Sequence, residues 1–136
     1  MSKLFGKGSV CLENAINNWK KSKTDDKMCE FLVDSACFNL QQSMEFFLKG
    51  FVQMQGQQYV KNHDLRAQIN KLDFDKQAGL SEICDEIRTN ASTFNSWETD
   101  SRYKDSFVTT VDDVQKAISI CQRLEELAGR IIHEIN

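Results

Sequence analysis

The longest apolar pattern in the chain lies within residues 26–54, and it constrains the fold more than any other feature. Large apolar side chains recur there at steps of three and four residues, which is the spacing of one face of an α-helix. The stripe consists of Leu32, Ala36, Leu40, Met44, Phe47, Phe51 and Met54. Further apolar residues on both sides widen it beyond what one neighbouring helix covers. We therefore predict a long central helix that packs against several others.

Four other segments have helical spacing, at about 10–22, 65–72, 80–95 and 110–135, and polar or glycine-containing stretches separate them. The chain contains no proline, the residue that most often breaks helices. Its 136 residues suffice for one hydrophobic core and are few for two. We therefore predict a single all-α domain over residues 1–136.

The charge of the chain limits its partners. The net charge of -3 and the pI near 5.4 create no overall positive field that would attract nucleic acid, so any phosphate contact must be local. No apolar run resembles a signal peptide or approaches the roughly 18 residues of a membrane span. We expect a cytoplasmic protein with no membrane segment.

The sequence lacks the common catalytic and cofactor motifs. It has two histidines, His63 and His133, and contains neither H-E-x-x-H nor a glycine-rich phosphate loop. Five widely spaced cysteines form no C-x-x-C pair, and we expect them to be reduced and mostly packed. We predict no metal and no cofactor. For His63 and Asp64, helix capping is favoured over metal binding, because an aspartate before an apolar run is typical of a helix start.

The long predicted helix also carries polar side chains away from its apolar stripe. These are Gln41, Gln42, Glu45 and Lys49. Glu45 lies four residues before Lys49, the favourable order for an ion pair along a helix. We predict that this side of the helix is solvated.

One combination of segments resembles a known family. The stretch "SACFNLQQSMEFFLKGFVQMQG", a loop with "NHDL", a later "SRY" and a final long helix are similar to a HEPN domain (higher eukaryotes and prokaryotes nucleotide-binding), from about Met28 to the C-terminus. The resemblance implies an antiparallel up-down bundle of four to five helices that often dimerises. It also implies a role related to nucleotides or RNA. Frequent pairing with a small nucleotidyltransferase, often as a toxin–antitoxin couple, is implied as well.

The ribonuclease branch of that family carries an arginine followed four to six residues later by a histidine. Here only two residues separate Arg130 from His133, and no arginine precedes His63. This departure favours a module without ribonuclease activity over an enzyme. A displaced site of Arg130 and His133, which lie three residues apart and share a helix face, is the catalytic alternative.

The segment "SWETDSRYKD" combines aromatic rings that can stack on bases with cations that can contact phosphate. In the alternative, its rings close the end of the bundle, and Arg102 pairs with Glu98 or Asp100. If a ligand binds, we expect it to contact Arg102, Tyr103, Lys49, His63 and Trp97.

Three hypotheses follow. The first is a non-catalytic module that binds nucleotide or RNA, as a homodimer or as the partner of a nucleotidyltransferase. The second is a metal-independent ribonuclease toxin with the displaced Arg130 and His133 site. The third is a purely structural domain for protein interaction.

Overall fold

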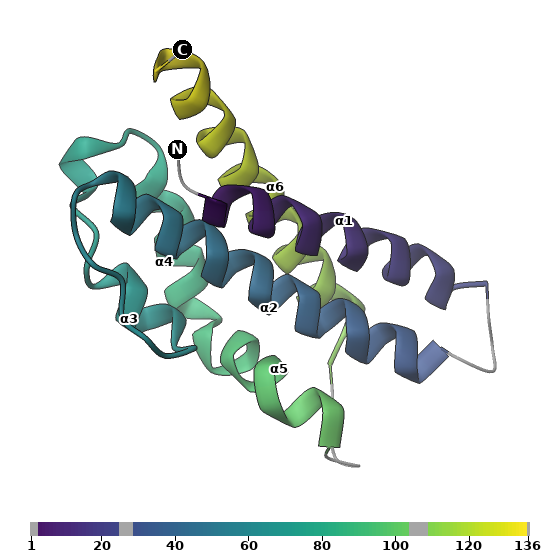
Figure 1. Cartoon of the computed structure of the whole chain (residues 1–136). Helices are drawn as coiled ribbons and strands as arrows, with labels where there is room; N and C mark the ends of the chain where they lie inside the picture. The colour runs from purple at the N-terminus through teal and green to yellow at the C-terminus, as the bar shows by residue number, and fades with distance from the viewer. Residues whose placement is uncertain (1–2, 25–28, 104–108, 136) are drawn as a thin grey trace.

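The computed structural model describes residues 3–24, 29–103 and 109–135, with side chains for 3–24, 29–98 and 109–132. Within these ranges the chain forms α-helices and one short 3-10 helix and has no strand (Figure 1). The elements are α1 (Lys3–Ser22), α2 (Cys29–Met54), α3 (Leu65–Ile69), η1 (Phe74–Lys76), α4 (Leu80–Thr89), α5 (Ala91–Tyr103) and α6 (Val111–Ile135). The predicted all-α bundle is confirmed, with six α-helices where four to five were expected. No helix in the described ranges is long and apolar enough to cross a membrane.

Helix α2 is the centre of the bundle, as its wide apolar surface predicts. It contacts α1, α3, α5 and α6. Figure 1 shows α1 running antiparallel to α2 on one side and α5 on the opposite side. The stripe that begins at Leu32 is buried along most of its length, and Leu40, Met44 and Phe47 are fully enclosed. The two long sides of α2 are therefore covered by different elements.

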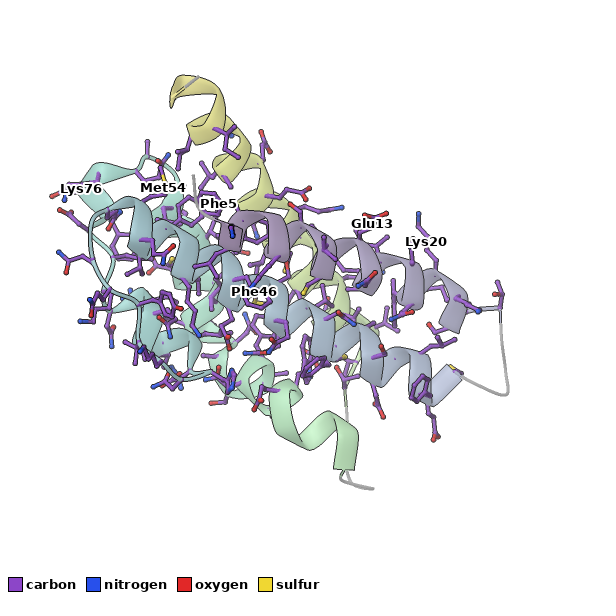
Figure 2. All side chains as sticks on the ribbon, viewed as in Figure 1. Phe5, Glu13, Lys20, Phe46, Met54 and Lys76 are labelled. Carbon is purple, nitrogen blue, oxygen red and sulfur yellow. The ribbon has the colours of Figure 1, made fainter. Side chains whose placement is uncertain are left out.

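Helix α1 begins at Lys3, seven residues earlier than predicted, and it includes Gly6 and Gly8. A side chain at Gly8 would meet the ring of Phe47 at 2.9 Å, and one at Gly50 would meet the ring of Phe5 at 2.6 Å. The hydroxyl of Ser43 donates to the carbonyl of Gly8 at 2.9 Å. Figure 2 shows Phe5 at the start of α1. Gly8 and Gly50 thus leave room for the rings of Phe47 and Phe5 where α1 packs on α2.

The predicted helix over 80–95 is two helices, and α5 extends to Tyr103, into the polar stretch that was expected to follow the helix end. Asn90 separates α4 from α5, and its side-chain amide donates to the carbonyl of Glu86 at 2.8 Å. Ile87, Ala91 and Phe94 are nevertheless all buried. The apolar spacing runs through the break, which explains why the sequence did not reveal it.

The apolar face of α6 is rotated slightly from the prediction. Val111, expected to point inward, is exposed, and Ile118 is only partly buried. Ala117 and Ile120 are buried instead. Of the inward positions predicted from Cys121 onward, Cys121, Leu124, Ala128 and Ile131 are confirmed, and the side chain of Ile135 lies outside the described residues. The described core residues of α6 are Val114, Ala117, Ile120, Cys121, Leu124, Leu127, Ala128 and Ile131.

All five cysteines are free, as predicted. Cys37, Cys84 and Cys121 are buried in α2, α4 and α6, and burial raises the pKa of each thiol to about 12. Cys11 and Cys29 are partly buried. A protonated, enclosed thiol is a poor nucleophile, so the three core cysteines contribute to packing.

Candidate functional site

A buried carboxylate organises the polar side of α2. Gln41, Glu45 and Lys49 have at most 8% of their surface exposed, so the prediction of a solvated face is wrong for them. The loop over residues 57–64 and helices α3 and α5 contribute the groups that pack on this side of α2. Helical spacing indicated that these side chains lie together, but it carried no information about what covers them.

Glu45 accepts from three side chains. The ammonium of Lys49 lies 3.1 Å from Oε2, which confirms the predicted ion pair, and His63 Nδ1 lies 2.9 Å from Oε1. The amide of Gln41 is 3.4 Å from the same Oε1 and also donates to the carbonyl of His63 at 3.2 Å. Burying a charge is expensive unless it is paired and hydrogen-bonded, and Glu45 meets both conditions.

Lys49 was predicted to contact a ligand directly. Its ammonium is instead enclosed between the Glu45 carboxylate and the ring of Tyr59, whose centroid is 5.0 Å away. A cation over an aromatic ring is stabilised by the negative face of the ring. Lys49 is therefore the counter-ion of Glu45 rather than a solvent-facing phosphate contact.

His63 connects the buried cluster to the surface. Its side chain is 58% exposed. An ionised carboxylate can only accept, so the bond to Glu45 places a hydrogen on Nδ1 and leaves Nε2 as the outward nitrogen. Nε2 lies 3.8 Å from Oε1 of Glu98 in α5. The imidazole thus has one fixed nitrogen and one that faces outward.

Asp64 caps α3, as predicted. Its carboxylate accepts from the backbone N–H of Arg66 at 3.0 Å and from the side-chain amide of Asn95 in α5 at 3.0 Å. The side-chain oxygen of Asn95 in turn accepts from the backbone N–H of Leu65 at 3.1 Å. His63 has no part in this cap, because its ring bonds to Glu45. The start of α3 is therefore joined to α5 directly after His63.

Gln68 of α3 bonds to the backbone of the loop that precedes this helix. Its amide is buried, donates to the carbonyl of Val60 at 2.9 Å and accepts from the N–H of Val60 at 3.0 Å. It lies 3.4 Å from the carbonyl of Asn62 as well. With Glu45 bonded to His63 and Gln68 bonded to the loop, the backbone that carries the imidazole is fixed at several points.

The comparison with protein families settles what this chain is similar to. The model of the HEPN domain family matches residues 9–131, nearly the whole chain. The chain belongs to the HEPN domain family. Membership associates it with helical modules whose roles relate to nucleotides or RNA in general. No curated protein and no solved structure matches the chain at a significant level.

Two of the stretches that carried the resemblance meet in this HEPN domain. "QQSMEFFLK" in α2 supplies Gln41, Glu45 and Lys49, and "NHDL" supplies His63 and the Asp64 cap. Glu45, Glu98 and Asn95 were not predicted as site residues. A signal for Glu45 existed, because polar residues at 41, 45 and 49 recur at steps of four within an otherwise apolar helix. Glu98 and Asn95 reach this site from α5 only through tertiary packing, which helical spacing does not predict.

Trp97 does not belong to the surface of this HEPN domain. Its ring is fully buried and packs against Phe94 with ring centroids 5.1 Å apart. A ring without exposed surface cannot stack on a base, so the predicted ligand contact is replaced by the packing alternative. The backbone of Arg102 lies one helical turn beyond Glu98 in α5, and the side chains of Arg102 and Tyr103 lie outside the described residues.

The displaced catalytic pair lies on α6. Arg130 is exposed and its guanidinium is 3.0 Å from the carboxylate of Glu126. The side chain of His133 lies outside the described residues. Among the described residues, no group of three histidine, cysteine, aspartate or glutamate side chains could hold a metal ion.

Proposed function

We propose that this HEPN domain binds nucleotide or RNA without cleaving it, at the surface around His63 and the C-terminal half of α5. The observation that carries the proposal is the buried Glu45. Its carboxylate fixes the exposed imidazole of His63, and the ammonium of Lys49 neutralises the charge of that carboxylate. A hydrophobic cluster of the same size would stabilise a bundle at least as well as a buried ion pair. Buried charges next to an exposed titratable group are typical of functional sites.

The absence of turnover is supported by the residues around each histidine. No arginine precedes His63, and Arg130 is separated from His133 by only two residues. Arg130 also has a partner on its own helix, Glu126. The ribonuclease pattern of the family, as the resemblance describes it, is therefore incomplete at both positions.

The proposed ligand lies across the end of α5. Arg102, one turn beyond Glu98, contributes a cation for phosphate, and Tyr103 contributes a ring for a base. His63 borders the same surface through its proximity to Glu98. Lys49 contributes through Glu45, because its own ammonium is enclosed.

The first test is calorimetry of the purified protein against ATP, GTP and a short single-stranded RNA, together with a nuclease assay on that RNA. We expect binding without cleavage, and about tenfold weaker binding in Arg102→Ala, the usual effect of losing one charged hydrogen bond. Lys116→Ala is the control, because it removes one positive charge from an exposed pair with Asp112 on α6.

Each other outcome selects a different hypothesis. RNA cleavage that disappears in His133→Ala would replace this proposal by the ribonuclease toxin. A protein that binds none of the three ligands would be the structural interaction domain. Equal weakening in Arg102→Ala and Lys116→Ala would mean that overall charge, rather than a site on α5, governs binding.

We further propose that the protein acts as a homodimer or as the partner of a small nucleotidyltransferase in a toxin–antitoxin-like pair. Phe31 supports an interface, because at 65% it is the most exposed large apolar side chain among the described residues. Sedimentation velocity tests the homodimer. We expect a dimer that Phe31→Glu weakens, and a monomer at all concentrations would leave only the heterologous partner.

A further inference from the structure

A ring nitrogen and a carboxylate oxygen from different elements face each other at the proposed site. His63 Nε2 comes from the loop before α3, and Glu98 Oε1 comes from α5. They are 3.8 Å apart, which is beyond hydrogen-bond distance, so neither atom satisfies the other. The His63 side chain is largely exposed, and 22% of the Glu98 side chain is exposed. A ligand in solution can therefore approach both atoms.

The hydrogen bond to Glu45 determines which nitrogen of His63 faces outward. Because Nδ1 donates to Glu45, a neutral imidazole presents the lone pair of Nε2 to solvent. Glu98 presents carboxylate lone pairs beside it. The pair is thus complementary to a ligand that carries two hydrogen-bond donors on neighbouring atoms.

The local charge argues against phosphate at this point. Among the described residues of the cluster, two carboxylates, Glu45 and Glu98, are matched by a single ammonium, that of Lys49. With a neutral imidazole the cluster is net negative, and the ammonium is enclosed beneath Tyr59. A phosphate next to Glu98 would be repelled, whereas a neutral donor group would be attracted.

We infer that His63 and Glu98 bind the nucleoside part of the ligand through a pair of adjacent donors. This deepens the proposed function and rests on it. In a ribonucleotide, two groups have this chemistry: the cis-diol of the ribose and the N1–H and N2–H₂ edge of guanine. Carboxylates are suited to accepting from ribose hydroxyls and from base N–H groups. Any phosphate then lies farther along α5, away from Glu98.

Titration of the whole protein with four nucleosides in the presence of EDTA separates the two donor sources. Adenosine, 2′-deoxyadenosine, guanosine and 2′-deoxyguanosine carry no phosphate, so binding reports the nucleoside alone. If the diol is bound, both ribonucleosides bind and both deoxy forms bind about tenfold more weakly. If the guanine edge is bound, guanosine and 2′-deoxyguanosine bind alike and the adenosines do not. Either pattern supports the inference.

The variant Glu98→Gln keeps the size of the side chain and replaces one acceptor oxygen by an NH₂ donor. We expect it to weaken nucleoside binding by about tenfold or more. Glu98→Ala, which removes the acceptor, is a second variant with the same expectation. Glu82→Gln on the exposed side of α4 is the control, and it should bind like the wild type. Thermal unfolding of each variant confirms that it is folded.

Several results would overturn the inference. Equal affinity for all four nucleosides, or affinity unchanged in both Glu98 variants, would show that His63 and Glu98 do not bind a pair of donors. Binding that requires Mg²⁺ would assign the two atoms to a cation instead. If GTP binds but guanosine does not, the site recognises phosphate, so this inference fails while the proposed function stands. If no nucleotide or RNA binds at all, both fail together.

Discussion

The two long sides of α2 are both buried, but by opposite means. Toward α1 the contact depends on shape: Gly8 and Gly50 leave room for the rings of Phe47 and Phe5. Toward the 57–64 loop the contact depends on charge, with Glu45 at its centre. Lys49 and Gly50 are neighbours in sequence and belong to different sides. One helix thus joins a packing interface to a polar cluster without any break in its backbone.

Loss of the Glu45 carboxylate, on the charged side of α2, should destabilise the protein most. Glu45→Ala leaves the Lys49 ammonium buried without its carboxylate, and we expect a loss of about 3–5 kcal/mol in the free energy of unfolding. Chemical denaturation measures it. The double variant Glu45→Met with Lys49→Met removes both charges at once and should be clearly more stable than Glu45→Ala. A double variant as unstable as the single one would mean that charge pairing is not what holds this side.

The next effect tests the side that depends on shape. In Gly50→Ala the new methyl group overlaps the ring of Phe5, so we expect a net loss of about 1–2 kcal/mol despite the better helix propensity of alanine. Gly6→Ala is the matched control. Nothing lies within 4 Å of a side chain at Gly6, so this variant should gain about 0.5–1 kcal/mol. If both variants behave alike in thermal unfolding, the glycines do not set the spacing of α1 and α2.

A smaller effect concerns the cap that follows His63. Asp64→Ala removes the acceptor for the N–H of Arg66 and for Asn95, and it should cost about 1 kcal/mol. Asp64→Asn retains a good capping oxygen and should cost much less. Urea denaturation of both variants measures the difference. Equal losses would show that the carboxylate charge, rather than the cap, stabilises α3.

The smallest effect belongs to an exposed pair outside both sides of α2. The guanidinium of Arg123 on α6 bonds to Glu86 on α4, with one N–O distance of 2.8 Å, and it lowers the pKa of the Glu86 carboxyl. A lowered folded-state pKa adds stability above the unfolded pKa, and that stability is lost as pH falls through the folded pKa.

Both partners of this pair are more than a third exposed, so solvent screens it and we expect about 0.2–1 kcal/mol. The difference in unfolding free energy between the wild type and Glu86→Gln should be present at neutral pH and vanish in acid. A difference that grows in acid would contradict this assignment.

The sequence predicts the helices well because burial imposes a spacing of three and four residues wherever a helix meets the core. It predicts the breaks less well. At Asn90 the apolar spacing continues from Ile87 to Ala91, so the end of α4 depends on local capping that periodicity does not detect. In α1, glycine at position 8 lowers the local helix propensity. It is nevertheless inside the helix, where a larger side chain would overlap the ring of Phe47.

The candidate site was predicted only in part for a similar physical reason. His63 and Lys49 were identified, and both bond to Glu45 of α2, which was not predicted as a site residue. His63 comes from a loop, and its second neighbour, Glu98, comes from α5. The sequence predicted that a helix ends near residue 95, so it assigned no helix to Trp97 and Glu98 and gave no basis for saying which of the two faces the loop. Trp97 was expected at the ligand because its segment combines rings with cations, but it is buried in α5, and Glu98, the next residue, lies beside His63.

The three enclosed thiols can report when individual helices of the bundle open. Cys37, Cys84 and Cys121 belong to three different helices, and with pKa values of about 12 they stay protonated and unreactive at neutral pH while the helices remain packed. A thiol reagent modifies them only during the moments when a helix separates from its neighbours. The order in which the three become labelled would therefore rank the helices by how often each one leaves the core.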